Sequence, residues 1–94
     1  MAIINVYPTT HFAKAYKNLP ENIRVLTKQK EQFFKVSPFD SKLNTHKLKG
    51  RFKGYWAYSI DYHYRIMFKF IDKETVIYYD IGAHDIYKWP GSTA

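Results

Sequence analysis

The chain contains no cysteine, so neither disulfide bonds nor thiolate chemistry can contribute to its stability or activity. No apolar run approaches the roughly 18 residues that a membrane-spanning helix needs. The first residues, MAIINVYPTTHF, also lack the charged head and apolar stretch of a signal peptide. We therefore expect a cytoplasmic protein that makes no contact with a membrane.

Acidic residues are scarce as well. The 94 residues include 15 Lys and Arg but only 8 Asp and Glu, which gives a formal net charge of +7. The imbalance is strongest between Lys42 and Lys69, where Asp61 is the one acid in the stretch. A chain so basic favours a polyanionic partner, which is either a nucleic acid or an acidic protein.

The order of apolar patterns predicts a small α+β domain. Residues 2–7 are apolar and β-branched, which indicates a short strand, and Thr9 or Thr10 can cap a helix over residues 11–19. A second helix is predicted from Glu21 to Lys35, and strands are predicted over residues 55–61, 64–70 and 76–81, ending at Gly82. The order β–α–α–β–β–β predicts an antiparallel meander sheet packed against an N-terminal helical hairpin, with residues 1–88 as one domain and 89–94 as a loose tail.

The two-residue period of a strand separates a core face from a basic face. If Tyr64, Ile66, Phe68 and Phe70 pack under the helices, then His63, Arg65 and Lys69 lie on the opposite face. The same alternation predicts one shared face for the basic residues that open the meander, which are Lys47, Lys49, Arg51 and Lys53.

The stretch HKLKGRFKGYW, residues 46–56, interleaves basic side chains with rings. Phosphates attract such cations and nucleobases stack on such rings, so the pattern is typical of nucleic-acid binding. A solvated, positively charged strand and turn would explain the same residues. Trp56 is expected in the core rather than on a binding surface.

Residues 46–68, HKLKGRFKGYWAYSIDYHYRIMF, followed by IGAHDIY at residues 81–87, resemble the RelE/ParE superfamily of toxins from bacterial type II toxin–antitoxin systems. The resemblance implies a microbial-RNase-like fold. It also implies a small ribonuclease of the RelE/YoeB/YafQ-like mRNA interferase branch, which cleaves mRNA, usually in the ribosomal decoding site. A tightly bound antitoxin would neutralise it. The ParE branch implies a different activity, the poisoning of DNA gyrase.

Metal-independent RNA cleavage moves the 2′-hydroxyl onto the adjacent phosphorus, and it needs a base, an acid and cations around the phosphorane. His84 is the predicted general acid or base, and the alternatives are an exposed loop histidine or a histidine bonded to Asp85. Arg65 is the predicted phosphate ligand, with a structural salt bridge to Asp61 or Asp80 as the alternative. His46 and His63 are both candidates for the partner base.

Other residues are predicted to position the RNA, and these are Lys47, Lys49, Arg51, Lys53, Lys69 and Tyr87. No cofactor and no metal are expected, and the expected partners are an acidic antitoxin and mRNA on the ribosome. Two departures from the family pattern stand out: NTHKLKG holds no glutamate that could act as a base, and no long basic tail follows Tyr87. A gyrase-inhibiting toxin and an inactive antitoxin-binding subunit therefore remain alternatives.

Overall fold

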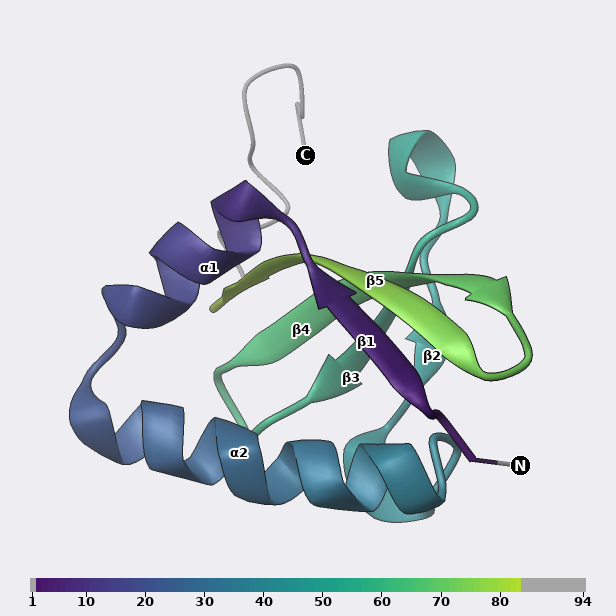
Figure 1. Ribbon diagram of the computed structural model, residues 1–94. Helices are drawn as coiled ribbons and strands as arrows, with labels where there is room; N and C mark the ends of the chain where they lie inside the picture. The colour runs from purple at the N-terminus through teal and green to yellow at the C-terminus, as the bar shows by residue number, and fades with distance from the viewer. Residues whose placement is uncertain (1, 84–94) are drawn as a thin grey trace.

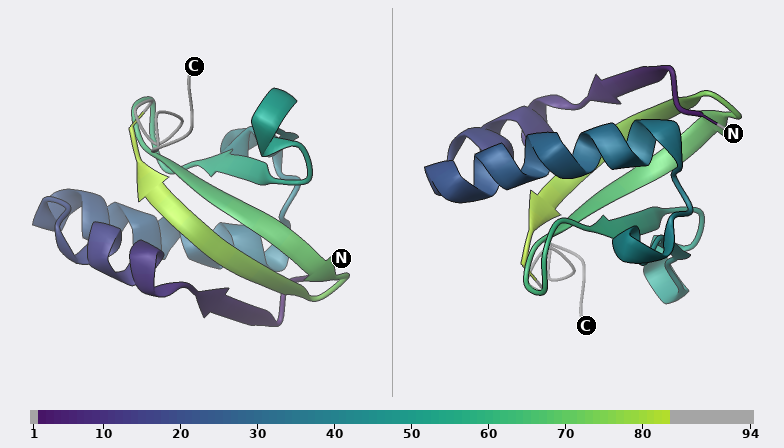
Figure 2. Two further views of the ribbon diagram at one scale, coloured as in Figure 1. Left: turned by 90° about the horizontal axis from the view of Figure 1, so that it is seen from above. Right: turned by 90° about the horizontal axis from the view of Figure 1, so that it is seen from below.

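Two α-helices lie on one side of a mixed β-sheet in the computed structural model, which describes residues 2–83 (Figure 1). The elements are β1 (Asn5–Pro8), α1 (Thr10–Lys17), α2 (Glu21–Val36), β2 (His46–Lys47), β3 (Trp56–Ser59), β4 (Arg65–Asp72) and β5 (Thr75–Gly82). Two 3-10 helices, η1 (Ser41–Leu43) and η2 (Gly50–Phe52), flank β2. Views from above and below place both α-helices on the same side of the sheet, and no α-helix of residues 2–83 covers the other side (Figure 2). The predicted α+β fold is confirmed.

The sheet orders its strands β1–β5–β4–β3–β2 within the described residues. Strands β2 to β5 pair antiparallel, as predicted. The first strand instead pairs with β5 in parallel, with Asn5 opposite Thr75 and Pro8 opposite Tyr78. This pairing makes the sheet mixed, which the sequence pattern did not predict. Parallel neighbours need a long connection, and here the helices and three strands lie between the two partners in the chain.

The strand expected across residues 47–53 is much shorter than predicted. β2 comprises His46 and Lys47, and the chain then turns into η2. Gly50 and Gly54 have φ angles of +66° and +95°, in the left-handed region that residues with a side chain rarely adopt. The backbone turns at both glycines, so the basic residues of this segment do not line one face of a strand. The prediction of a shared face for them was wrong.

The two helices form where capping and apolar spacing indicate. The Thr9 hydroxyl accepts a hydrogen bond from the Phe12 backbone N–H at 3.1 Å and so caps α1, as predicted. The second helix runs one residue beyond its predicted end and buries Ile23, Thr27 and Phe34. Neither helix in residues 2–83 combines the length and apolarity needed to cross a bilayer.

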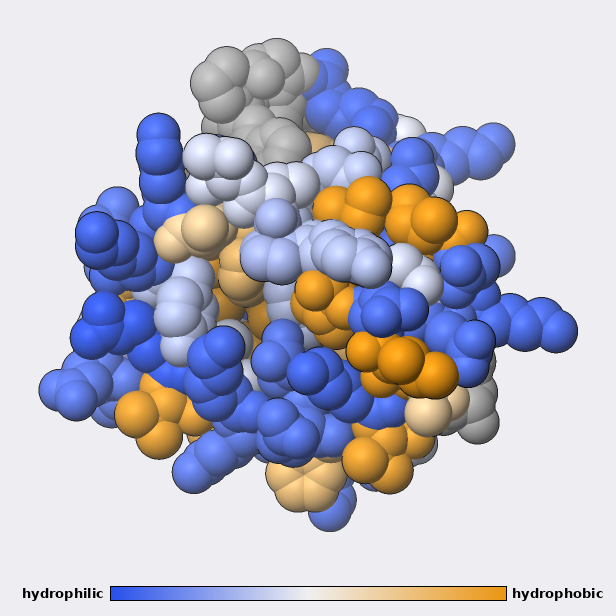
Figure 3. All heavy atoms as spheres, in the orientation of Figure 1, coloured by the Kyte–Doolittle hydropathy of each residue, from blue (hydrophilic) through white to orange (hydrophobic). Residues whose placement is uncertain are grey.

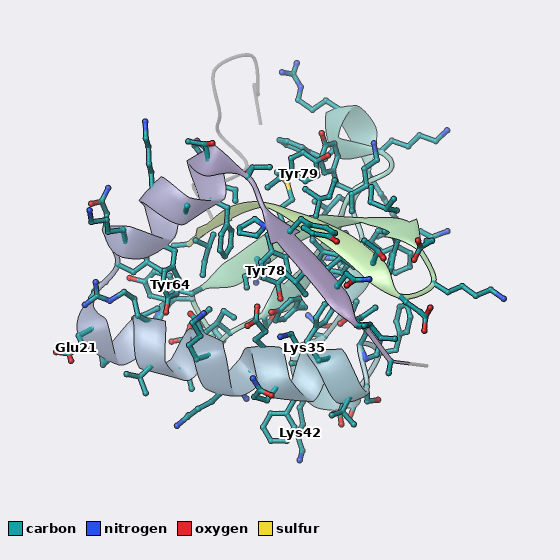
Figure 4. All side chains as sticks on the ribbon, viewed as in Figure 1. Glu21, Lys35, Lys42, Tyr64, Tyr78 and Tyr79 are labelled. Carbon is teal, nitrogen blue, oxygen red and sulfur yellow. The ribbon has the colours of Figure 1, made fainter. Side chains whose placement is uncertain are left out.

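An aromatic core fills the space between α2 and the sheet. Phe34 stacks on Tyr58 with ring centroids 4.3 Å apart and meets Phe68 nearly edge-on at 5.0 Å. The predicted inward face is confirmed, because the core includes or packs against Tyr64, Ile66, Phe68 and Phe70. Tyr78 points to the helix side of the sheet and Tyr79 to the opposite side (Figure 4).

Two tyrosine hydroxyls are buried together inside this core. Tyr58 and Tyr78 are at most 1% exposed, and their hydroxyl oxygens lie 2.8 Å apart in a hydrogen bond. Burial raises the pKa of Tyr58 and of Tyr78 well above the ordinary value, and the nearby negative charge of Glu31 raises the pKa of both further. Both tyrosines therefore stay neutral in the folded protein.

We expect the folded state to lose stability above about pH 10, where tyrosines ionise in the unfolded chain. Because the pKa values of Tyr58 and Tyr78 are raised on folding, their contribution is complete below that pH and is lost as pH rises. The loss is up to about 1.4 kcal/mol per pH unit for each tyrosine. Urea unfolding from pH 8 to 11 measures it, and the double variant Tyr58→Phe/Tyr78→Phe should show a shallower decline. An identical decline in both proteins would contradict the claim that Tyr58 and Tyr78 cause this loss of stability.

Candidate functional site

The side of the sheet away from the α-helices carries two of the predicted catalytic residues, His46 and Arg65. Directly paired residues on neighbouring strands point to the same face. Arg65 pairs with Ser59 on one side and with Gly82 on the other, and His46 pairs with Ala57, which in turn pairs with Met67. Arg65 and Met67 are two residues apart on β4, so His46 and Arg65 share this side. It is called the open face below.

Strand geometry fixes the separation of His46 and Arg65. Two inter-strand spacings of about 4.8 Å and two residues of about 3.4 Å along the strand put their Cα atoms about 12 Å apart. Both side chains are long enough to approach one phosphodiester group lying between them. The sequence pattern could not show this, because it depends on the register of β2 on β3 and of β3 on β4.

The His46 ring is held by a backbone carbonyl. Its Nδ1 lies 2.8 Å from the carbonyl oxygen of Asn44. A carbonyl only accepts hydrogen bonds, so Nδ1 carries the proton and, in the neutral ring, Nε2 keeps a lone pair that can accept one. Asn44 has a φ of +50°, at the left-handed end of η1, and this turn brings its carbonyl back toward the ring. Sequence reasoning missed Asn44.

Arg65 is the first residue of β4 and is half-buried. Its backbone is fixed between β3 and β5, so the position of its Cα is set by the most extensively paired part of the sheet. Asp61, one of its predicted salt-bridge partners, accepts hydrogen bonds from the backbone N–H groups of His63 and Tyr64 at 2.8 and 2.7 Å. That carboxylate therefore shapes the β3–β4 turn.

His63 lies in this turn, just before β4, and is exposed. Its ring meets that of Tyr62 edge-on, with centroids 5.2 Å apart. His63 is two residues from Arg65 along the chain but outside the paired strand, so its side-chain direction is not set by the sheet. Its predicted role as the base is not tested by the structure.

The basic residues predicted to bind RNA are distributed over two regions. Lys47 pairs with Trp56, and its Nζ lies 5.6 Å from the centre of the Trp56 ring, on the helix side of β3. Lys49, Arg51 and Lys53 follow in and around η2, and all three are exposed. Lys69, by contrast, is on the open face, with its Nζ 5.0 Å from the centre of the Tyr55 ring.

Two aromatic residues on the open face were not singled out from the sequence. The rings of Tyr55 and Tyr79 meet edge-on with centroids 5.0 Å apart, next to Lys69. Tyr79 lies two residues after Ile77, which pairs with Lys69, so strand alternation puts both on this side. His84 and Tyr87, also predicted to act here, lie outside the described residues.

Asp80 is buried, as its place in an apolar strand suggested, and its carboxylate lies 3.1 Å from Nε2 of His11. It also accepts a hydrogen bond from the Ile81 backbone N–H at 2.8 Å. The side chain of His11, on α1, is 61% exposed. The Asp80 carboxylate therefore contacts a histidine of α1.

No family model matches the sequence, and no curated protein matches it. Solved structures share its fold. The RelBE2 toxin–antitoxin complex of Mycobacterium tuberculosis aligns with a TM-score of 0.73 at 16% identity, over 89% of this chain and all of that chain (100%). The YoeB/ParE toxin of Agrobacterium tumefaciens gives 0.71 at 16% identity, over 86% and 99%. YafQ of E. coli gives 0.69 at 15% identity, over 87% and 94%.

At such identities the likeness establishes the fold. The predicted resemblance to RelE/ParE toxins is thereby confirmed at the level of the fold, across most of the chain.

Proposed function

We propose that this chain, which has the fold of the RelE and YafQ toxins, is the toxin of a toxin–antitoxin pair and cleaves mRNA without a metal ion. The observation that carries the proposal is the placement of His46 and Arg65 on one open face, with the His46 ring anchored through Nδ1. The names of two neighbours, RelBE2 and DinJ–YafQ, describe toxin–antitoxin complexes, which supports an antitoxin partner.

The proposed reaction uses one base, one cation and one acid. His46 Nε2 takes the proton of the 2′-hydroxyl, whose oxygen then attacks the neighbouring phosphorus. The Arg65 guanidinium, a planar cation, stabilises the extra negative charge of the phosphorane. His84 donates a proton to the leaving 5′-oxygen, and the products are a 2′,3′-cyclic phosphate and a 5′-hydroxyl. His63 is the alternative base.

The competing function is inhibition of DNA gyrase without nuclease chemistry. Protein binding alone gives no reason to hold a histidine ring through Nδ1 on the same face as an arginine, so the geometry favours RNA cleavage. An inactive, antitoxin-binding subunit is a further alternative, because NTHKLKG holds no glutamate that could act as the base.

Controlled induction of the protein in bacteria, followed by mapping of mRNA 5′ ends, tests the proposal. A nuclease on the ribosome should create new 5′-hydroxyl ends within coding regions, in register with codons, within minutes. Growth arrest without new ends, together with loss of gyrase supercoiling activity in vitro, would favour the ParE-like function. No growth effect would favour the inactive subunit.

The antitoxin should be acidic and partly disordered before it binds, and it should associate faster at low ionic strength. The charge of +7 is the reason for the expected salt dependence. The contact surface would be the exposed apolar residues on the helix and β1 side of the molecule: Ile4, Tyr7, Val25, Phe33 and Val36. In Figure 3, small apolar patches on this side lie among hydrophilic residues. Stopped-flow association between about 50 and 500 mM salt measures the effect, and an on-rate indifferent to salt would contradict it.

A further inference from the structure

A pocket lies beside the start of β3, at the edge of the sheet formed by β2. Its volume is about 480 Å³, and its walls include the rings of Tyr55, Trp56 and Phe70 and the side chains of Lys47 and Lys53. This volume is in the range of small-molecule sites, which are commonly lined by rings with a few polar groups. The pocket is distinct from the catalytic pair, because neither His46 nor Arg65 lines it.

The Trp56 indole is fixed in place from the core side. Phe39 and Phe70 meet it nearly edge-on, with ring centroids 5.5 and 5.2 Å away. The residue is nevertheless half-buried rather than buried, and it lines the pocket. A rigid ring with part of its surface accessible is the geometry that stacking requires.

Lysine ammonium groups already occupy ring faces around the pocket. Lys47 Nζ lies over Trp56 at 5.6 Å, and Lys69 Nζ lies over Tyr55 at 5.0 Å. Gly54, on the rim, has a φ of +95°, and a Cβ there would lie 3.7 Å from Lys69 Cε, so the rim passes close to this lysine. An incoming planar group can replace an ammonium on its ring, and the flexible lysine can then reach an adjacent anion.

Charge decides which planar group fits best. The pocket walls carry lysines and no acid, and the chain from Lys42 to Lys69 has Asp61 as its one acidic residue. An apolar side chain of a protein would use the rings but not the cations. A nucleobase with its phosphate uses both, since the ring stacks and the phosphate pairs with ammonium.

We infer that this pocket binds one unpaired nucleobase of RNA, stacked on Trp56, with Lys47 and Lys53 contacting the phosphates beside it. The inference rests on the proposed function, because it assigns the pocket to the same RNA strand that reaches the catalytic face. It adds a position that would select for single-stranded RNA away from the cleaved bond.

Fluorescence of Trp56 gives a direct test with the full-length chain. The variant Trp89→Phe leaves Trp56 as the one tryptophan in the sequence. The probes are a single-stranded 2′-O-methyl RNA octamer, which cannot be cleaved, and an octamer with the same backbone but no bases. We expect the first to quench Trp56 fluorescence and to bind about 5- to 150-fold more tightly than the second.

Two lysine variants provide matched controls. Lys47→Gln removes a charge at the pocket, and Lys14→Gln removes the same charge from α1, which lies at the opposite edge of the sheet. Both residues are exposed, so both variants should fold. Lys47→Gln should weaken binding of the octamer, and it should lower the steepness of the plot of log binding constant against log salt concentration by about 0.7. Lys14→Gln should change neither quantity.

Each other outcome overturns the inference. Binding detected by anisotropy without quenching, or equal affinity for the abasic octamer, would place the RNA elsewhere. Equal effects of the two lysine variants would show that RNA affinity depends on the overall positive charge of the protein and not on the pocket. Quenching by the antitoxin but not by RNA would assign the pocket to a protein partner. None of these results bears on mRNA cleavage, which the mapping of 5′ ends decides separately.

Discussion

Replacement of Arg65 by alanine should abolish toxicity and RNA cleavage while the protein remains folded. The guanidinium is the fixed cation that the phosphorane would meet on the open face, at a Cα position set by pairing with both Ser59 and Gly82. Loss of one such preorganised donor typically costs about 2–4 kcal/mol, which corresponds to roughly 30- to 900-fold in rate. Cleavage of a reporter mRNA, together with a thermal unfolding curve, measures both quantities.

Two further variants separate catalysis from structure at this position. Arg65→Lys keeps the charge but loses the planar fork, so it should recover only part of the rate. Arg24→Ala is a matched control, because Arg24 is a half-buried arginine on α2 that donates to the Lys17 carbonyl at 3.2 Å, remote from the open face. It should leave cleavage unchanged. If Arg65→Ala unfolds the protein and Arg24→Ala does not, Arg65 has a structural role instead.

Local patterns in the sequence predicted the parts of the fold that depend on neighbours in the chain. The Thr9 cap follows from a threonine just ahead of an amphipathic run, and the inward face of β4 follows from strict alternation. Both signals extend over fewer than about ten residues. They are therefore readable without knowing what the elements pack against.

The features that were missed depend on contacts between distant residues. The parallel pairing of β1 with β5 joins residues 70 positions apart, and no local pattern distinguishes it from an antiparallel edge. The break after β2 depends on two glycines with positive φ, which the sequence allows but does not require. The basic residues were recognised as a group, but the strand registers decide that Lys47 lies at the pocket and Lys69 on the open face.

In the candidate site, too, some features could be predicted from the sequence and others depend on contacts between distant residues. Residue chemistry was enough to select His46 and Arg65, because imidazole and guanidinium suit phosphoryl transfer. Their placement on one face depends on two strand registers, and the orientation of the His46 ring depends on the Asn44 carbonyl. Neither is encoded in a motif, so sequence reasoning left both His46 and His63 as candidates for the base.

The change of His84 to glutamine should slow cleavage by roughly 100- to 10,000-fold with RNA binding nearly unchanged. The residue lies outside the described part of the chain, but it follows Gly82 by two positions, and Gly82 pairs directly with Arg65. This nearness in the sequence to the strand partner of Arg65 is the reason to test His84.

The pH dependence of the variants decides what each histidine does. With one base and one acid, kcat/KM of the parent protein should rise and then fall across neutral pH. If His84 is the acid, His84→Gln should remove the fall at high pH, and His46→Gln should remove the rise from low pH. His63→Gln is the matched third variant, and it should behave like the parent unless His63 is the base. Growth inhibition by His84→Gln equal to that of the parent would exclude proton transfer by His84 and would shift support to gyrase inhibition.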